Sequence, residues 1–415
     1  MSPNETLASS AQAARATSAL RPADPPRSRA EALERARRLL PGIRARAERA
    51  EADRRLPEES IAELRDAGLF ALATPKRYGG SELGFAGLVE VASALASACG
   101  STGWVYGVLT GHAWMAALFP PEAQAEVFTD PQPLIAGVFR LSGTSVPVEG
   151  GYRLSGGSGR FCSGIDFSSW VVVGNSVQRP DAQPEPRYLL VPVKDLEIID
   201  DWHTAGMRGT GSRSIRIADA FVPEHRTVLA SVLMRGTSPG AQQHRLSRTY
   251  AVPFPIGLPF SLVGTPLGLA RGALECLTET LTARFGAMPI EQAGEQGALF
   301  ARVARAAAEL QAAECLVLHH ATRLETIDPA QMSALERASI IRDLAYAAQS
   351  CRYVATHLFE AAGGGGIYSS SPMQRILRDA NTASAHTAFS WDEAATHFGR
   401  AHFGIAPSRF AGPRR

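Results

Sequence analysis

The order of residue patterns along the chain constrains its fold more than any other feature: helical, then strand-like, then helical again. In the first part, apolar residues recur at the spacing of one helix face. Helices are expected there over 30–50, 58–67, 81–98 and 104–118, with a break at 100–103. In the middle, short β-branched and aromatic runs between turn residues predict a small β-domain. Its clearest strands are at 152–154, 170–173, 188–193 and 214–217.

Long helical segments return in the last part of the chain, over 262–283, 291–326, 330–360 and 373–403. Four helices of this length predict an antiparallel bundle. The expected fold class is α+β. Its parts are a disordered tail at 1–28, an N-terminal α-domain at 29–130, a central β-domain at 131–235 and a C-terminal four-helix bundle at 236–415. The tail is assigned from its Ala-, Ser- and Pro-rich composition, which lacks the apolar segment of a secretion signal.

Composition excludes several classes of function. The 415 residues include 42 basic and 40 acidic ones, a net charge of +2, so no overall field favours a nucleic-acid partner. Prolines interrupt the longest apolar stretch, at 252–270, so no membrane-spanning helix is expected. Five cysteines are scattered without a CxxC pair, which favours a reducing, cytoplasmic location over a disulfide framework.

Three glycine-containing segments are candidates for a binding site. Segment 202–212 places glycines, an arginine and hydroxyls between two strands, which suits close approach to a phosphate or a flat ring. Segment 160–164 is expected just before a strand, where its main chain can bond the edge of a heterocycle. The glycines at 363–366 interrupt two helical segments and leave room for a bulky group. An ordinary turn or a flexible loop is the alternative in each case.

Two histidines are candidates for proton transfer. His386 is expected on the last helix among small polar residues, which suggests a cavity, and His112 lies on the apolar fourth helix. A structural histidine is the alternative for each. His319 and His320 are adjacent on a helix and point in different directions, and no HExxH motif is present, so no metal site is expected. Dinucleotide, P-loop and GxSxG motifs are also missing from the sequence.

Several motifs together resemble the acyl-CoA dehydrogenase fold, over about residues 30 to 412. The segment Gly-Met-Arg-Gly-Thr at 206–210 leads into Phe-Val-Pro-Glu-His at 221–225, as in that fold. Further segments look most like its flavin-dependent monooxygenase branch, which includes the oxygenase component of 4-hydroxyphenylacetate hydroxylase. These segments are 101–104, 161–164, 364–365, 372–375, 378–379 and 386–392.

The last helix distinguishes this branch from true dehydrogenases. When Arg378-Asp379 is aligned with the dehydrogenases' own Arg-Asp, their proton-abstracting glutamate falls on Thr387. The catalytic base of a dehydrogenase is therefore absent at that position. Some dehydrogenases carry the glutamate elsewhere in the bundle, and Glu275, near Arg271, is the substitute that keeps this alternative open.

The resemblance implies the oxygenase component of a two-component monooxygenase. Such an enzyme takes reduced flavin (FMNH2 or FADH2) from a separate NAD(P)H-flavin reductase. With O2 it forms a C4a-hydroperoxyflavin, which hydroxylates a small aromatic substrate. The alternatives are an N-oxygenase acting on an amine or amino sugar, and an acyl-CoA dehydrogenase or oxidase. A homo-oligomer, expected to be a tetramer, is also implied.

The resemblance also assigns roles to residues. His386, Ser163 and His112 are the catalytic candidates, with the Ser163 hydroxyl near flavin N5. Trp104 would cover the ring, and Arg284 with Gly364 and Gly365 would meet the phosphate or a neighbouring subunit's cofactor. The expected flavin-binding set is Trp104, Val138, Phe139, Arg140, Phe161, Cys162, Ser163, Arg284, Gly364, Gly365, His386 and Thr387.

Overall fold

The computed structural model describes residues 24–179 and 182–405. Most of the tail expected at 1–28 therefore lies outside the described residues. Helix α2 (Arg29–Asp53) begins where the tail was predicted to end, because the Ser28 hydroxyl accepts a hydrogen bond from the Glu31 N–H and caps the helix. Pro41 lies inside α2 without ending it.

Within the described residues, four further helices follow α2 in the N-terminal part: α3 (Glu58–Asp66), α4 (Phe85–Ala98), α5 (Gly100–Ala116) and α6 (Pro121–Val127). The break predicted at 100–103 is wrong, because α5 begins at Gly100 and only Cys99 is extended. The glycines serve packing here: a Cβ at Gly103 would lie 2.8 Å from the Ala92 carbonyl oxygen of α4. The start predicted for α4 at residue 81 is also four residues early.

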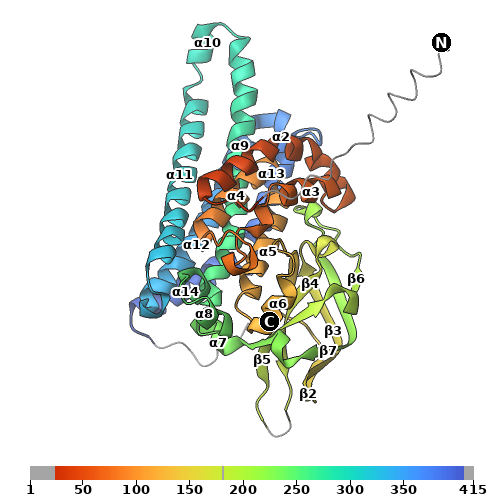
Figure 1. The fold of residues 1–415 in the computed structure, drawn as a ribbon. Helices are drawn as coiled ribbons and strands as arrows, with labels where there is room; N and C mark the ends of the chain where they lie inside the picture. The colour runs from red at the N-terminus through yellow and green to blue at the C-terminus, as the bar shows by residue number, and fades with distance from the viewer. Residues whose placement is uncertain (1–23, 180–181, 406–415) are drawn as a thin grey trace, which may run out of the picture.

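Helix α5 is buried along its whole length, all 17 residues included. Glycine lets it approach α9 (Phe254–Gly286), since a Cβ at Gly107 would overlap the Ser261 carbonyl oxygen. Figure 1 shows α5 in the middle of the molecule, between the β-domain and the long C-terminal helices. Any side chain of α5 that meets a ligand therefore does so from the interior.

The central part is one eight-stranded sheet with the order β6-β7-β3-β2-β4-β5-β8, and β1 pairs in parallel with β4. The four strands seen in the sequence are parts of β3, β4, β5 and β7, while β1, β2, β6 and β8 were not predicted. The strands are β1 (Ile135–Val138), β2 (Thr144–Val148), β3 (Gly151–Cys162), β4 (Trp170–Val177), β5 (Glu185–Pro192), β6 (Glu197–Ile199), β7 (Arg213–Pro223) and β8 (Thr227–Leu229).

Strand β4 is buried on both faces, which fixes how the sheet sits on the helices. Val172 packs into the core shared with the helices, whereas its neighbours Val171 and Val173 pack into a second core inside the β-domain. This alternation follows the two-residue period of a strand. The sheet is thereby packed on the helices, and β1, which pairs with β4, contacts α5.

Two short helices, α7 (Ala230–Arg235) and α8 (Pro239–Gln243), lead into the C-terminal helices. These are α9, α10 (Ile290–Gly294), α11 (Gly297–Thr326), α12 (Ala334–Ala362), α13 (Pro372–Ser384) and α14 (Trp391–His402). The single helix predicted over 373–403 is wrong, because the chain turns between α13 and α14. In Figure 1 the hairpin of α9 and α11, closed by α10, extends well beyond the rest of the fold.

Short 3-10 turns connect these elements. They are Leu69–Ala71, Lys76–Tyr78, Ile165–Phe167, Val193–Asp195, Arg208–Thr210, Glu224–Arg226, Arg248–Ala251, Pro329–Gln331, Gly363–Ile367 and Thr387–Phe389. No helix in the described part of the chain is both long enough and apolar enough to cross a membrane.

Candidate active site

A row of hydrogen-bonded hydroxyls lies where α5 meets the β-domain. The Trp104 indole N–H donates to Ser163 Oγ at 3.1 Å, and Ser163 Oγ lies 2.7 Å from Ser212 Oγ. Ser212 Oγ lies 2.7 Å from Thr210 Oγ1, whose hydroxyl donates to the Met207 carbonyl oxygen at 2.8 Å. All of these side chains are buried. Segments far apart in the sequence thus share one polar row.

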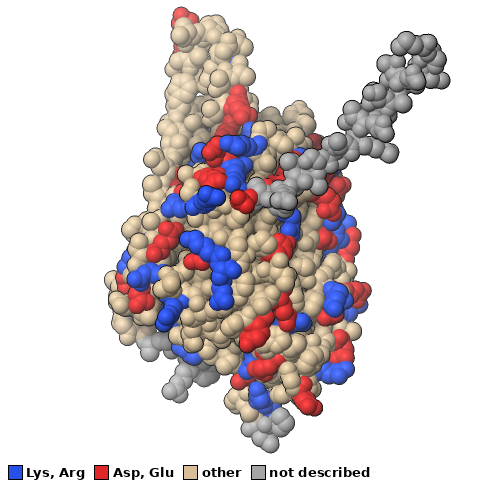
Figure 2. Space-filling model, viewed as in Figure 1, with Lys and Arg blue, Asp and Glu red and all other residues tan. Residues whose placement is uncertain are grey.

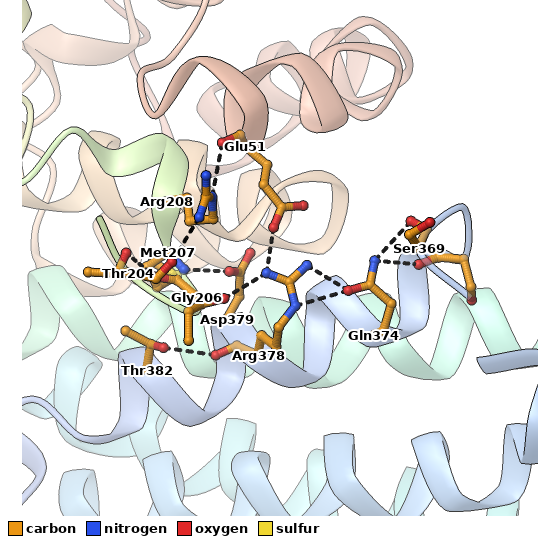
Figure 3. Close-up of polar contacts among 12 residues, drawn as sticks. Glu51, Thr204, Gly206, Met207, Arg208, Ser369, Gln374, Arg378, Asp379 and Thr382 are labelled. Atoms are coloured by element: carbon orange, nitrogen blue, oxygen red, sulfur yellow. Dashed lines mark hydrogen bonds and ion pairs between the residues drawn. The ribbon is translucent and has the colours of Figure 1, made fainter. Parts of the chain in front are cut away.

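The loop between β6 and β7 supplies the last three of these residues and is held by a buried carboxylate. Asp379 of α13 accepts the Met207 N–H at 2.5 Å, and Met207 has a left-handed backbone (φ 54°) that a non-glycine residue rarely adopts. Burial raises the pKa of Asp379 to about 6, and nearby Glu51 acts in the same direction. Figure 3 shows the Asp379 carboxylate beside Met207, with a dashed line for the hydrogen bond.

Arg378 fastens the same loop from the side. Its guanidinium donates to the Ala205 carbonyl oxygen at 2.7 Å, and it also bonds Glu51 of α2 and Gln374 of α13 (Figure 3). A Cβ at Gly206 would overlap the Arg378 carbonyl oxygen, so only glycine fits this approach. The glycine-rich segment 202–212 lies between strands as predicted, and the structure shows that it docks on helices α2 and α13.

His386 closes the row at Trp104, with ring centroids 5.5 Å apart. It lies in the turn after α13 rather than on a helix as predicted. Its Nδ1 accepts the Ala388 N–H at 3.1 Å, which assigns the ring proton of the neutral form to Nε2. Desolvation lowers the pKa of His386 to about 4, although the residue keeps an exposed surface. The lowered pKa leaves a neutral imidazole at pH 7.

His112 lies farther along α5 and has the opposite tautomer. Its Nδ1 faces the Ile135 carbonyl oxygen at 3.1 Å and must carry a proton to bond it, so Nε2 is left as an acceptor. Burial lowers the pKa of His112 to about 4. Its ring packs edge-on against Phe139 with centroids 5.4 Å apart, while Val138 is buried and Arg140 is exposed.

The segment 160–164 ends β3 and, as predicted, precedes a strand, since β4 begins at Trp170 after the turn Ile165–Phe167. Phe161 has a left-handed backbone (φ 67°), its side chain is 68% exposed, and its ring lies 6.1 Å from that of Trp202. The Cys162 side chain is fully buried in the core of the β-domain, and burial raises the pKa of its thiol. Only the main chain of Cys162 is therefore available to a ligand.

Several other residues predicted for the site do not lie near this row of hydroxyls within one copy of the chain. Arg284 is exposed in the last turn of α9, on the protruding hairpin, and Gly364, Gly365 and Thr387 are exposed on the surface. Glu275, the alternative dehydrogenase base, pairs with Arg44 of α2 at 2.9 Å on an exposed surface. Within 24–179 and 182–405, no group of three or more acidic, histidine or cysteine residues is placed to hold a metal ion.

Sequence analysis did not assign Thr210, Ser212 or Asp379 to the site. Both hydroxyls lie in the candidate segment 202–212, and Asp379 lies in the motif Arg378-Asp379. A lone aspartate among Ala, Asn and Thr on a helix that is otherwise apolar on one face was the available signal for a buried tether.

Comparisons with known proteins agree with this architecture. Residues 30–131 match the model of the acyl-CoA dehydrogenase N-terminal domain, and residues 261–391 match that of the C-terminal domain. A pigment production hydroxylase of Rhodococcus sp. is 35% identical over 377 residues, which cover 90% of this chain and 96% of that protein. The oxygenase component of an FADH2-dependent resorcinol hydroxylase of Rhizobium sp. is 33% identical, covering 88% of this chain and 92% of that protein.

Solved structures give the same result. The 3-HSA hydroxylase from Rhodococcus sp. RHA1 has a TM-score of 0.87 at 30% identity, covering 91% of this chain and 98% of that one. XiaF from Streptomyces sp., in complex with FADH2 and glycerol, has a TM-score of 0.84 at 31% identity, covering 92% and 97%. These relatives support the hydroxylase reading over the N-oxygenase and dehydrogenase alternatives. The chain therefore belongs to the oxygenase components of two-component flavin-dependent aromatic hydroxylases, built on the acyl-CoA dehydrogenase fold.

Proposed function

We propose that this chain binds reduced flavin beside Trp104, Ser163 and His386 and uses it with O2 to hydroxylate a small aromatic substrate. The proposal rests on the observation that these three side chains lie in one cluster. It joins aromatic faces, a buried hydroxyl and a neutral imidazole donor at the edge of the β-domain, with threonine where a dehydrogenase has its base. A separate NAD(P)H-flavin reductase supplies the flavin.

The residues present suit a flavin. An isoalloxazine has large apolar faces and one polar edge, and here Trp104 and the exposed Phe161 offer aromatic surface while Ser163 offers a polar atom. When bound, reduced flavin supplies the activation of O2. We propose FADH2 over FMNH2, because the resorcinol hydroxylase and XiaF, at 33% and 31% identity, are both named with FADH2.

The chain's own side chains then position and protect the reacting groups. His386 presents Nε2–H as a donor to an oxygen atom at the flavin edge, and His112 offers Nε2 as an acceptor for a substrate hydroxyl. The buried walls of α5 exclude water that would divert the reaction to hydrogen peroxide. We place this activity in the cytoplasm, since all five cysteines are free thiols.

The purified chain is expected to show no NADH or NADPH oxidation of its own, because its sequence carries no dinucleotide-binding motif. Hydroxylation of phenols should appear only when a flavin reductase, or chemically reduced FAD, is added. Substrate-dependent product formation is measured by liquid chromatography with and without the reductase. Sustained NADH oxidation by the chain alone, or acyl-CoA oxidation with an artificial acceptor, would contradict the proposal.

We also propose a homotetramer in which the protruding hairpin packs on neighbouring copies and brings Arg284 to another copy's cofactor. Ile290 is 82% exposed and Phe300 is 44% exposed on this hairpin. In Figure 2 the face of the hairpin in view is largely uncharged, whereas both signs of charge intersperse over the body. Large exposed apolar side chains on such a surface mark a protein contact.

Light scattering should give about four times the 44.2 kDa chain mass. The double change Ile290→Glu and Phe300→Glu should reduce that mass, because buried unpaired charges oppose the contact. Leu246 is also exposed but is not part of the hairpin, and the control Leu246→Glu should leave the measured mass unchanged. A flavin-bound monomer at micromolar concentration would contradict the tetramer.

A further inference from the structure

The row from Trp104 to Met207 has a fixed direction, which follows from counting its hydrogens. An indole N–H can only donate, so Ser163 Oγ accepts from Trp104. A carbonyl oxygen can only accept, so the single hydrogen of the Thr210 hydroxyl goes to Met207. Both ends of the row are therefore unambiguous.

The two hydroxyl–hydroxyl contacts between those ends can now be assigned. Thr210 has no second hydrogen, so the 2.7 Å contact with Ser212 must be donated by Ser212. Ser212 has then used its own hydrogen, so the 2.7 Å contact with Ser163 must be donated by Ser163. Every hydroxyl hydrogen points from α5 toward the loop, and Ser163 retains one free lone pair and no free hydrogen.

We propose that Ser212 and Thr210 are positioning residues that hold Ser163 as an acceptor only, so that the site discriminates between the redox states of flavin. The inference rests on the proposed function and on the role that the resemblance implies for Ser163, with its hydroxyl near flavin N5. In reduced flavin N5 carries a hydrogen, which the free lone pair of Ser163 accepts. In oxidised flavin N5 is itself a lone pair, and two acceptors then face each other without a hydrogen between them.

A hydroxyl can reverse its hydrogen bond when water or another group offers a new partner, and the structure disfavours this along the row. Ser163, Ser212 and Thr210 are 7%, 4% and 2% exposed, so little water is present to offer another partner. Its far end is held by Asp379, which binds the Met207 N–H, and by Trp202, whose indole N–H also donates to the Met207 carbonyl oxygen at 3.1 Å. Reversing Ser163 therefore requires reversing the whole row.

Two variants release the hydrogen of Ser163 without touching Ser163. Ser212→Ala removes its acceptor. Thr210→Val removes the acceptor of Ser212. Ser212 can then donate to Ser163, which frees the hydrogen of Ser163 even though Thr210 does not contact Ser163 itself. Dissociation constants for oxidised and anaerobically reduced FAD, with the midpoint potential of the bound flavin, measure the effect. The ratio of oxidised to reduced dissociation constants should fall about threefold to tenfold in both variants, and a tenfold fall lowers the potential by about 30 mV.

Controls separate hydrogen-bond direction from simple damage. Thr210→Ser keeps the hydroxyl and should keep the wild-type ratio. Ser168→Ala removes a nearby hydroxyl that bonds the Gly164 carbonyl oxygen outside the row, and should also keep it. The unaltered protein offers a second measurement with oxidised 5-deaza-FAD, in which a C–H replaces the N5 lone pair. It should bind several-fold more tightly than oxidised FAD.

The outcomes distinguish this inference from the proposed function. If the wild-type chain binds no flavin, the proposed function fails. If it binds reduced FAD but both folded variants keep the wild-type ratio, or if 5-deaza-FAD binds no better than oxidised FAD, the inference is overturned while the proposed function stands. If the variants do not fold, the 5-deaza-FAD result alone decides.

Discussion

Replacing His386 by alanine is expected to lower the rate of substrate hydroxylation about a hundredfold while reduced flavin still binds. The reason is that the Nε2–H donor beside Trp104 acts on the reacting oxygen, so its loss is felt mainly in the transition state. Flavin oxidation should continue, with hydrogen peroxide replacing hydroxylated product. Product and peroxide measured in the same reaction give the coupling ratio directly.

His386→Gln tests whether donation is the function of this residue, because a glutamine amide keeps a donor but cannot titrate. It should recover part of the coupling. Exposed His397 on α14 provides the matched control, and His397→Ala should couple as the wild type does. Since the pKa of His386 is lowered toward 4, no titration of this group is expected between about pH 6 and 9. Full coupling in His386→Ala would make the residue a packing residue and contradict the donor role proposed for it.

Asp379→Leu is expected to lower the free energy of unfolding by about 1–3 kcal/mol and to abolish flavin binding. The buried Met207 N–H loses its acceptor, and the β6–β7 loop loses the contact that holds its left-handed residue. Asp379→Asn keeps an oxygen for that N–H and should retain most of the binding. Urea unfolding and a flavin titration measure the two effects. The exposed Asp195→Leu should change neither.

The same carboxyl predicts a pH dependence of stability. Its folded-state pKa, about 6, lies above the ordinary value of 3.8. Between about pH 4 and 6 the folded chain therefore holds a proton that the unfolded chain has lost, so this group's contribution to stability falls as pH rises through that window. As pH rises to about 6, the unfolding free energy of the wild type should fall relative to that of Asp379→Asn. Above about pH 6 the difference between the two should stay constant. A difference independent of pH would contradict the raised pKa.

The helices were largely predictable because the periodicity of apolar residues is a local property of the sequence. The errors occur at residues whose contacts are with segments far away in the sequence. Gly100 and Gly103 suggested a helix break, but Gly103 allows α5 to pack on α4, and Gly100 lies against Leu269 of α9 and Asp379 of α13. Strands β1, β6 and β8 have only three or four residues each, and the partners of β1 and β8 lie far along the chain. Their pairing energy is invisible in their own composition.

The site was predictable in part, through resemblance rather than through spacing. Trp104, Ser163 and His386 were expected together, and the structure places them in one cluster. Their catalytic and flavin-binding roles remain predictions. The direction of the hydroxyl row was not predictable, because it depends on which oxygen lies at each end. Asp379 lies 172 residues from Met207, and only the fold reveals that one holds the other.

The burial of α5 bears on how this enzyme can be divided. A helix enclosed on every side has no surface with which to face water, so it cannot complete a free-standing N-terminal unit. A fragment ending near residue 130 would expose the seam at Gly107 that now receives α9, and would aggregate. Evolution faces the same constraint as the protein engineer. Recombination at this junction would have to exchange α5 and α9 together, although about 140 residues separate them along the chain.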